Sequence, residues 1–496
     1  MSQHGIALDS GPGFNERVRS AVIWRWGSQL LAQLITWTTT IMVVRLLEPR
    51  DYGLFAMTQA ILTALNFLNC YSFASSLIHP KEIDERRIGQ VFGLLIIANA
   101  LLAGTQLVLA PFAADYYHQP LVTDLLRVQA LIYITTPFIA LPASLLARGL
   151  NFRTQALVNL ICAVIGGVVA LTLAWLDYGV WALVWAPIAM FTTRALGLTI
   201  AAGLPVRPIF DFRGGGDVLG FGTALTLCQL FWIIQSQSDI FIAGHYFTPH
   251  DLGLYSEALF LVLIFTGRFL PPLNEVAFPA YAELHNSGKP IGPAFVASVR
   301  MMMLIAAPFY VGFSLVAGPL VETFFGPKWL EMIPIAAGLA IAMPAMALQI
   351  VCSPATNALG KPWIYVFTNA CGAVIMPAGF LFGVAAGPHG LVAAWQIAAP
   401  LLLLATLAAT LPAVKVGPIE LARALLPAAA GCGVMALTVS LLGSQLLHLP
   451  APLQLVLLAA AGAAVYGGAL WLGWPELVRE TWIMLRRPKA STPQSA

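Results

Sequence analysis

The sequence predicts an all-α membrane protein of about fourteen transmembrane helices. Hydrophobic residues make up 59% of the chain and charged residues only 9%, whereas a soluble globular domain carries roughly 25% charged residues. The polar residues are clustered, and the apolar runs between them are about 20 residues long, the length that a helix needs to cross the hydrocarbon core of a bilayer. The bilayer is therefore the solvent for most of the side chains.

The expected spans can be placed in order along the chain from windows of about 19 residues. In the first half they lie near residues 22–44, 53–77, 88–113, 125–146, 156–176, 181–203 and 218–244. In the second half they lie near residues 252–272, 297–318, 333–352, 363–383, 391–411, 425–443 and 453–473. The connections are short, the longest being about 24 residues around 273–296, so we expect no inserted soluble domain and no extramembrane catalytic module.

The distribution of basic residues predicts that both termini are cytoplasmic. An even number of spans places both termini on one side of the membrane, and most of the 25 Lys and Arg residues fall in the tails and in the even-numbered connections. Arg45, Arg50 and Lys328 fall in connections on the opposite side. Cytoplasmic loops carry the excess of Lys and Arg in membrane proteins, so the richer side is expected to face the cytoplasm.

An internal repeat relates the first six expected spans to the next six. Residues 48–55, EPRDYGLF, match residues 248–255, TPHDLGLY, and Asn159 and Trp185 match Asn369 and Trp395. Two units of six helices have the same orientation, as in transporters built from parallel repeats. We expect a cytoplasmic tail at 1–21, six-helix bundles at 22–211 and 212–411, two further helices at 412–473 and a cytoplasmic tail at 474–496.

The composition argues against several other classes of protein. A net charge of +3, scattered over the chain, gives no nucleic-acid footprint. The six cysteines lie in or at the edges of expected spans, which favours neither a disulfide framework nor a metal site. No GxxxxGK(S/T) phosphate loop is present, and the glycines at 214–216 form a linker. We therefore expect no cofactor, no metal and no ATP-driven transport by this chain.

Several segments resemble the polysaccharide flippases of the MOP superfamily, the O-antigen and exopolysaccharide branch whose relatives include the lipid II flippase and multidrug exporters. The resemblance covers nearly the whole chain. It rests on VVRLLEPRDYGLF at 43–55, SDIFIAGHYFTPHDLGLYSEA at 238–258, LNEVAFPAYAEL at 273–284 and FFGPKW at 324–329. The first of these is fairly specific to the polysaccharide-exporting branch.

This resemblance implies a non-enzymatic transporter of the bacterial inner membrane. It would flip an undecaprenyl-diphosphate-linked oligosaccharide from the cytoplasmic to the periplasmic leaflet, by alternating access through a cationic cavity, for exopolysaccharide or O-antigen assembly. The implied partners are this lipid, the membrane lipids, and the polysaccharide polymerase and chain-length and export proteins of the pathway. The resemblance does not identify the sugar.

Arginines within or beside the spans are the candidates for binding the diphosphate. A guanidinium stays charged and forks onto phosphate oxygens through two hydrogen bonds. Arg194 lies deepest, near the middle of its span, Arg25 and Arg268 lie near cytoplasmic ends of spans, and Arg45 lies at an external end. The alternative is that these side chains extend to the lipid headgroups.

Two acidic residues are candidates for ion coupling. Asp239 and Glu257 each lie about five residues from the external end of adjacent antiparallel spans, or roughly 7–8 Å in depth. They could therefore meet in a proton or sodium site, although a structural ion pair with an arginine such as Arg45 is an equal alternative. Amides such as Gln235, Gln237 and Asn369 suit either a sugar pathway or hydrogen bonds between helices.

Two other functions remain open at this stage. A membrane-embedded polymerase or glycosyltransferase would bind the same lipid, but such an enzyme usually needs a large external loop that is not visible in the sequence. A multidrug exporter would favour acidic and aromatic walls over intramembrane arginines. The flippase is the leading hypothesis.

Overall fold

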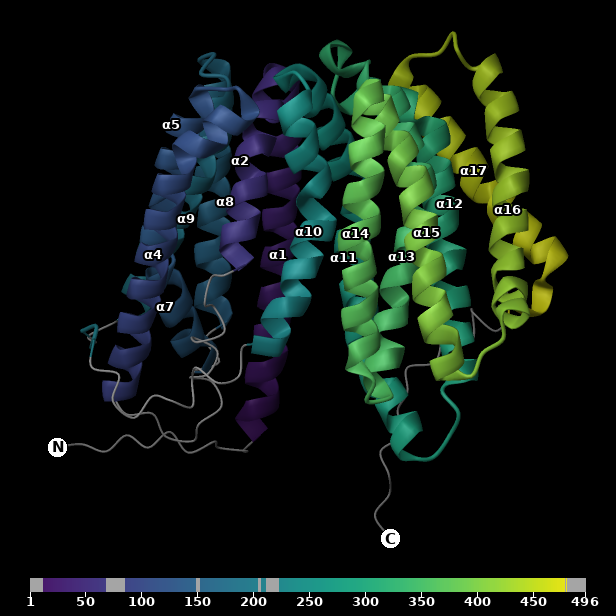
Figure 1. Cartoon of the computed structure of the whole chain (residues 1–496), viewed down its shortest axis with the longest axis horizontal. Helices are drawn as coiled ribbons and strands as arrows, with labels where there is room; N and C mark the ends of the chain where they lie inside the picture. Colours follow the sequence, from purple (N-terminus) through teal and green to yellow (C-terminus); the bar gives the residue numbers. More distant parts are fainter. Residues whose placement is uncertain are drawn as a thin grey trace. The chain divides into compact units, whose positions relative to one another are not determined.

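The computed structural model describes residues 12–67, 85–148, 152–203, 207–210, 223–477 and 479. Helices make up the secondary structure of these residues, and the chain divides into two compact units, Met1–Leu225 and Thr226–Ala496 (Figure 1). The predicted all-α class is confirmed.

The first unit contains the helices of the first repeat. They are α1 (Pro12–Leu46), α2 (Pro49–Phe67), α4 (Glu85–Tyr117), α5 (Leu121–Gln129), α6 (Leu131–Thr135), α7 (Pro137–Arg148), α8 (Phe152–Trp175) and α9 (Val180–Ala202). The short helices α5 to α7 together occupy one predicted span. Only Thr136 separates α6 from α7, which begins at Pro137, and proline cannot donate the backbone hydrogen bond that would continue a helix.

The second unit contains the second repeat and two additional helices. The repeat consists of α10 (Thr223–Tyr246), α11 (Pro249–Asn286), α12 (Gly292–Phe324), α13 (Met332–Ala358), α14 (Pro362–Gly383) and α15 (Gly387–Val414). Short 3₁₀ turns, η2 (Pro327–Trp329) and η3 (Val384–Ala386), lie between them. The additional helices are α16 (Pro418–Gln445) and α17 (Ala451–Gly473), which pack on each other and on α12 (Figure 1).

These helices agree with the predicted membrane spans. Ten segments of the described residues are long and apolar enough to cross a bilayer, one of which, Pro362–Val414, comprises α14, η3 and α15. Helices α1, α2 and α10 occupy the remaining predicted spans. Large apolar side chains such as Phe382, 88% exposed, and Ile200, 79% exposed, point away from the protein. This is expected where lipid is the solvent, and the chain is a multi-pass membrane protein.

Corresponding helices of the two units make corresponding contacts. Helix α8 packs on α9 as α14 packs on α15, and α7 packs on α9 as α13 packs on α15. The order of the helices and these contacts support the internal repeat inferred from the sequence.

The longest connection predicted from the sequence, around residues 273–296, is mostly helical, so this prediction of a loop was wrong. Residues 273–286 continue α11, and only Ser287 to Ile291 separate α11 from α12. Pro271 and Pro272 lie inside this helix. A proline is tolerated within a membrane helix where neighbouring helices or local adjustments provide new partners for the backbone groups that lose their hydrogen bonds. The polar residues that suggested a loop lie on a helical extension.

The repeated sequence motif forms the same kind of helix start in both units. In the first unit the Asp51 carboxylate accepts a hydrogen bond from the Glu48 backbone N–H at 3.1 Å. In the second, the Thr248 hydroxyl oxygen accepts one from the Asp251 N–H at 3.2 Å and its hydroxyl donates to the Asp251 carboxylate at 2.7 Å. These bonds satisfy backbone N–H groups that a helix start leaves without partners.

Asp51 also fixes the turn that precedes α9. Gly179 has a φ of 56°, and a Cβ atom there would lie 2.9 Å from Asp51 Oδ1. The FFGPKW segment is likewise structural: Trp329 is fully buried, and its ring meets that of Phe325 edge-on with centroids 5.7 Å apart. These two family motifs therefore shape the helix connections.

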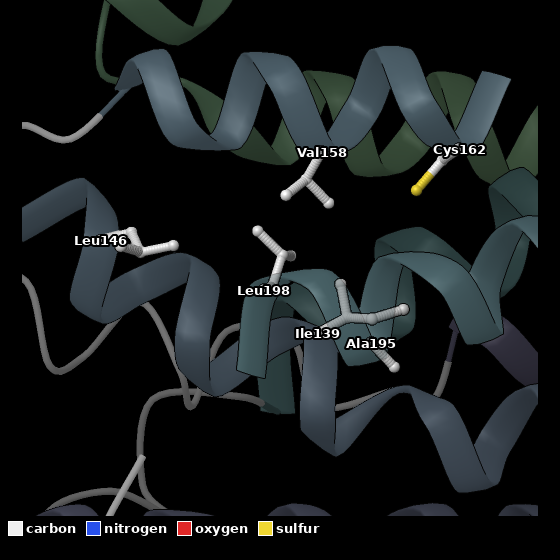
Figure 2. Packing of buried hydrophobic residues seen from close by; sticks show 6 residues of the cluster. All are labelled: Ile139, Leu146, Val158, Cys162, Ala195 and Leu198. Carbon is white, nitrogen blue, oxygen red and sulfur yellow. The ribbon is translucent and has the colours of Figure 1, made fainter. Parts of the chain in front are cut away.

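A compact apolar cluster holds α7, α8 and α9 together. Figure 2 shows its members, which come from α7, α8 and α9: Ile139, Leu146, Val158, Cys162, Ala195 and Leu198. This packing positions the α9 backbone that carries Arg194, the residue preceding Ala195.

Candidate functional site

Two adjoining cavities lie within the second unit. One has a volume of about 220 Å³ and the other about 340 Å³, and they share Trp232, Gln235, Met346, Gln349 and Ile350. Helices α10, α11, α13, α14 and α15 contribute the walls. Together these two cavities are called the carboxamide cavity below, after the side chains that distinguish it.

Four carboxamide side chains line this cavity without a protein partner. Gln235, Gln237, Asn274 and Gln349 make no hydrogen bond to the described residues, and the Gln235 Oε1 atom is inaccessible to solvent. Leaving a buried polar group unpaired costs roughly 1–3 kcal/mol. Apart from this Oε1 atom, which packs against Gly372, the amide groups of the lining are unused donors and acceptors for whatever occupies the cavity.

Three amides elsewhere in the described chain behave differently. Gln106 donates to the Leu126 carbonyl at 2.7 Å, Gln129 donates to the Thr58 hydroxyl at 3.1 Å, and Gln396 donates to the Gly338 carbonyl at 3.0 Å. Each of these bonds joins two helices, which is the usual role of an amide in a membrane protein. The carboxamide cavity departs from that role.

Local geometry holds Gln235 in place. The space that a Cβ atom would occupy at Gly372 on α14 is already filled by the Gln235 amide. Trp232 lies one helical turn before Gln235 on α10, and residues three apart share a helix face. Its ring is 41% exposed, so it offers an apolar surface beside the amides.

The carboxamide cavity contains no charge from the described residues. Its lining consists of amide, hydroxyl, apolar and aromatic side chains, without Asp, Glu, Lys, Arg or His. Asn369 and Thr406 also line it, and each donates to a carbonyl of its own helix. Of the amides that the sequence singled out, Gln235, Gln237 and Asn369 come together here.

Arg268, the predicted arginine of the second unit, lies outside this lining. Arg194 on α9 is half-buried, and its Nε atom is inaccessible to solvent and has no hydrogen-bond partner among the described residues. Arg268 is exposed and directly follows Gly267, which lines the larger cavity. Arg45 is exposed in the last turn of α1, and the side chain of Arg25 lies outside the described residues.

The Asp239 carboxylate is held by a buried hydrogen-bonded chain. The indole N–H of Trp395 donates to the Tyr255 hydroxyl oxygen at 2.7 Å, and the Tyr255 hydroxyl donates to Asp239 Oδ2 at 2.9 Å. The Ile240 N–H donates to Asp239 Oδ1 at 2.8 Å. Trp395 also lines the larger cavity, so this chain extends from Asp239 to the cavity wall.

Glu257 does not join this network. It is half-buried on α11 and has no hydrogen-bond or ion-pair partner among the described residues. The arrangement expected from the sequence, with the two carboxylates meeting, does not appear as a shared hydrogen bond. An isolated carboxyl group in a membrane helix is a functional candidate by default.

The sequence reasoning missed four of the residues that build these sites. Asn274 was placed in a connection, and Gln349 is the one amide in the apolar run 333–352, a signal that was available. Tyr255 and Trp395 were noticed only as parts of the repeat. Comparison of the repeats could have flagged Tyr255, because the matching position of the first unit is Phe55.

The fold is shared with solved transporters, one of which is described as a member of the MOP superfamily. The structure of the lipid II flippase MurJ in an inward closed conformation matches with a TM-score of 0.71 at 13% identity. The match covers 92% of this chain and 100% of the MurJ chain. An inward-facing multidrug resistance MATE transporter of the MOP superfamily matches with a TM-score of 0.61 at 14% identity, covering 81% and 98%. These likenesses define the class of the fold.

Within that class, the chain belongs to the polysaccharide biosynthesis protein family, whose model matches residues 42–334. The family resemblance stated from the sequence is confirmed.

Three curated relatives share part of the sequence. The teichuronic acid biosynthesis protein TuaB of Bacillus subtilis is 25% identical over 54% of this chain and 56% of its own length. The succinoglycan biosynthesis transport protein ExoT of Rhizobium meliloti is 23% identical over 62% of each chain. The lipopolysaccharide biosynthesis protein WzxC of Escherichia coli is 20% identical over 59% and 60%. The chain thus spans less than two thirds of each of these relatives.

Proposed function

We propose that this protein flips an undecaprenyl-diphosphate-linked oligosaccharide from the cytoplasmic to the periplasmic leaflet of a bacterial inner membrane. The product would feed exopolysaccharide or O-antigen assembly. Membership of the polysaccharide biosynthesis family, on a fold shared with a lipid II flippase, supports this function. The names of the relatives, which include a transport protein, support the same pathway. A polymerase or a multidrug exporter is not favoured.

Transport would proceed by alternating access through a cationic cavity. A diphosphate is too strongly hydrated to cross the hydrocarbon core unaided, so the protein must replace that hydration. Arg194 carries the proposal at residue level, because its Nε donor has no partner among the described residues and a guanidinium can fork onto phosphate oxygens. Arg25, Arg45 and Arg268 are the further proposed contacts with the diphosphate.

The test is movement of a fluorescent undecaprenyl-diphosphate oligosaccharide between the leaflets of liposomes that contain the purified protein. Arg194→Ala is expected to slow flipping at least tenfold, the effect of losing about 1.4 kcal/mol. Arg194→Lys keeps the charge but loses the fork, so an intermediate rate is expected.

Arg127→Ala is the matched control. Arg127 is exposed and lies 3.7 Å from Asp124 one turn earlier on α5, so its loss should leave the rate unchanged. Melting temperatures in detergent separate inactive protein from unfolded protein. Lengthening or consumption of the lipid in place of flipping would identify an enzyme and exclude the transporter.

We also propose that Asp239 and Glu257 couple transport to a proton or sodium gradient. The Asp239 chain extends to Trp395 in the cavity wall, and Glu257 has no hydrogen-bond or ion-pair partner in the part of the chain that the structure describes. Imposed gradients of either ion should accelerate flipping by the natural protein and not by Glu257→Gln. The control is Glu275→Gln. Glu275 is an exposed glutamate on the same helix, so this variant should respond to the gradients like the natural protein. A response of Glu257→Gln equal to that control would remove Glu257 from the mechanism.

A further inference from the structure

We infer that the carbohydrate portion of the lipid-linked substrate binds in the carboxamide cavity of the second unit, and that the sugar recognised there is uncharged. This inference rests on the proposed function. It assigns the sugar and the diphosphate to different groups of side chains, since Arg268, the proposed arginine of the second unit, lies outside the cavity lining.

The first argument is the match between the side chains and a sugar. A hydroxyl group donates one hydrogen bond and accepts others, and a carboxamide offers both donors and an acceptor. Gln235, Gln237, Asn274 and Gln349 bring such groups to one cavity and use none of them within the described protein. Trp232 supplies an apolar surface against which the C–H face of a sugar ring can pack.

The second argument is the absence of charge in the lining. A sugar carboxylate bound here would lose its hydration and meet no cation among the lining side chains. Burying an unpaired charge is far more costly than burying a hydrogen-bonded neutral group. The cavity therefore favours a neutral hexose unit over a uronic acid.

The Gln235 amide lies against the backbone of a neighbouring helix without forming a hydrogen bond to it in the described structure. The close approach of Gln235 to Gly372 requires a glycine at that position. Gly372→Ala should displace the Gln235 amide while leaving every amide in the sequence.

The volume of about 340 Å³ lies at the lower end of the range for small-molecule pockets and fits about one or two sugar rings.

The experiment measures binding of three lipids to the purified full chain by native mass spectrometry. The lipids are undecaprenyl diphosphate without sugar, the same carrier with one uncharged hexose, and the same carrier with one hexuronic acid. The natural protein is expected to bind the hexose lipid at least tenfold more tightly than the sugar-free lipid, and the hexuronic lipid no more tightly than the sugar-free one.

The variants separate the cavity from the rest of the protein. Gln235→Leu, Gln349→Leu and Gly372→Ala should each reduce the preference for the hexose lipid about tenfold, the effect of losing one good hydrogen bond, while binding of the sugar-free lipid stays unchanged. The matched control is Gln396→Leu. Gln396 donates to Gly338 on another helix, so this variant should keep the full preference.

Each contrary outcome has a distinct meaning. Equal binding of the three lipids, a preference for the hexuronic lipid, or a full preference retained by folded Gln235→Leu and Gln349→Leu would overturn the inference and leave the proposed flippase intact. Failure of all three lipids to bind the natural protein would remove the proposed function itself.

Discussion

At the scale of the residue, the two units differ where the chemistry is proposed. Position 255 carries tyrosine, whereas its counterpart in the first unit is Phe55. The added hydroxyl joins Trp395 to Asp239 in a fully buried position. The Tyr255 hydroxyl therefore forms the centre of a hydrogen-bonded network in the second unit, which a phenylalanine at this position could not form.

We therefore expect Tyr255→Phe to lower the free energy of unfolding by about 1–3 kcal/mol, because Asp239 and the Trp395 N–H each lose a partner in a buried site. Thermal melting of the purified protein in detergent measures this change. Tyr246→Phe is the control, since Tyr246 is 62% exposed, and its melting temperature should hardly move. Equal melting temperatures for both variants would show that the hydroxyl contributes nothing.

The sequence predicted part of the candidate site at this scale. Asp239 and Glu257 were recognised because charge is rare inside membrane spans, and Gln235, Gln237 and Asn369 because polar groups are. Which amides are free and which bind a neighbouring helix depends on contacts between distant helices, such as Gln396 with Gly338. The spacing of residues along one helix does not contain that information.

At the scale of the element, α11 is the helix that departs most from expectation. It continues through Pro271 and Pro272 to Asn286. Neither proline has an N–H to donate, so the carbonyls of Gly267 and Arg268 lose their usual helical partners. Gly267 lines the larger cavity, and this weakened turn therefore lies beside the proposed substrate site.

We expect replacement of both prolines by alanine to raise the melting temperature and to slow flipping. Alanine restores the backbone hydrogen bonds, and proline in a helix interior costs about 3 kcal/mol relative to alanine. A stiffer turn would then resist the movement that transport needs. Liposome flipping and thermal melting of the same variant measure the two effects.

Pro279→Ala separates the two effects, because Pro279 lies in the same helix but outside the cavity lining. Its expected result is added stability with an unchanged rate. If the double variant flips lipid as fast as the natural protein, flexibility at this turn has no part in transport.

Most element boundaries were predictable because lipid imposes one length and one composition on every span. The exceptions have local causes. One predicted span is interrupted at Ala130, where there is no proline, and at Thr136, before Pro137, while Pro271 and Pro272 fail to end α11. A proline alone therefore does not decide where a helix is interrupted, because the surrounding helices decide whether the lost backbone bonds can be accommodated.

At the scale of the whole molecule, the two units share an architecture but not a chemistry. The first unit contains Arg194, a half-buried cation whose Nε donor has no partner among the described residues, and the second contains a cavity without charged side chains in its described lining and the Asp239 chain. The proposed substrate, with its anionic diphosphate and neutral sugar, would need both kinds of surface. On this proposal, divergence of the repeats would supply them from one duplicated scaffold.

The direction of transport depends on how the whole molecule is oriented, and the basic residues predict that orientation. Ser287 lies in the exposed connection after α11, beside Lys289, and Leu447, 76% exposed, lies between α16 and α17. In a variant without the natural cysteines, Ser287→Cys should react with a membrane-impermeant maleimide only after the cells are opened. Leu447→Cys should react in intact cells.

Val374→Cys provides the reference for a position facing lipid. Val374 is 68% exposed near the middle of α14 (Pro362–Gly383), so a cysteine there should react under neither condition, because the thiolate that a maleimide needs does not form in hydrocarbon. The reverse pattern at residues 287 and 447 would place the basic connections outside the cell. In that case α11 would present its polar extension to the periplasm, and the proposed direction of flipping would have to be inverted.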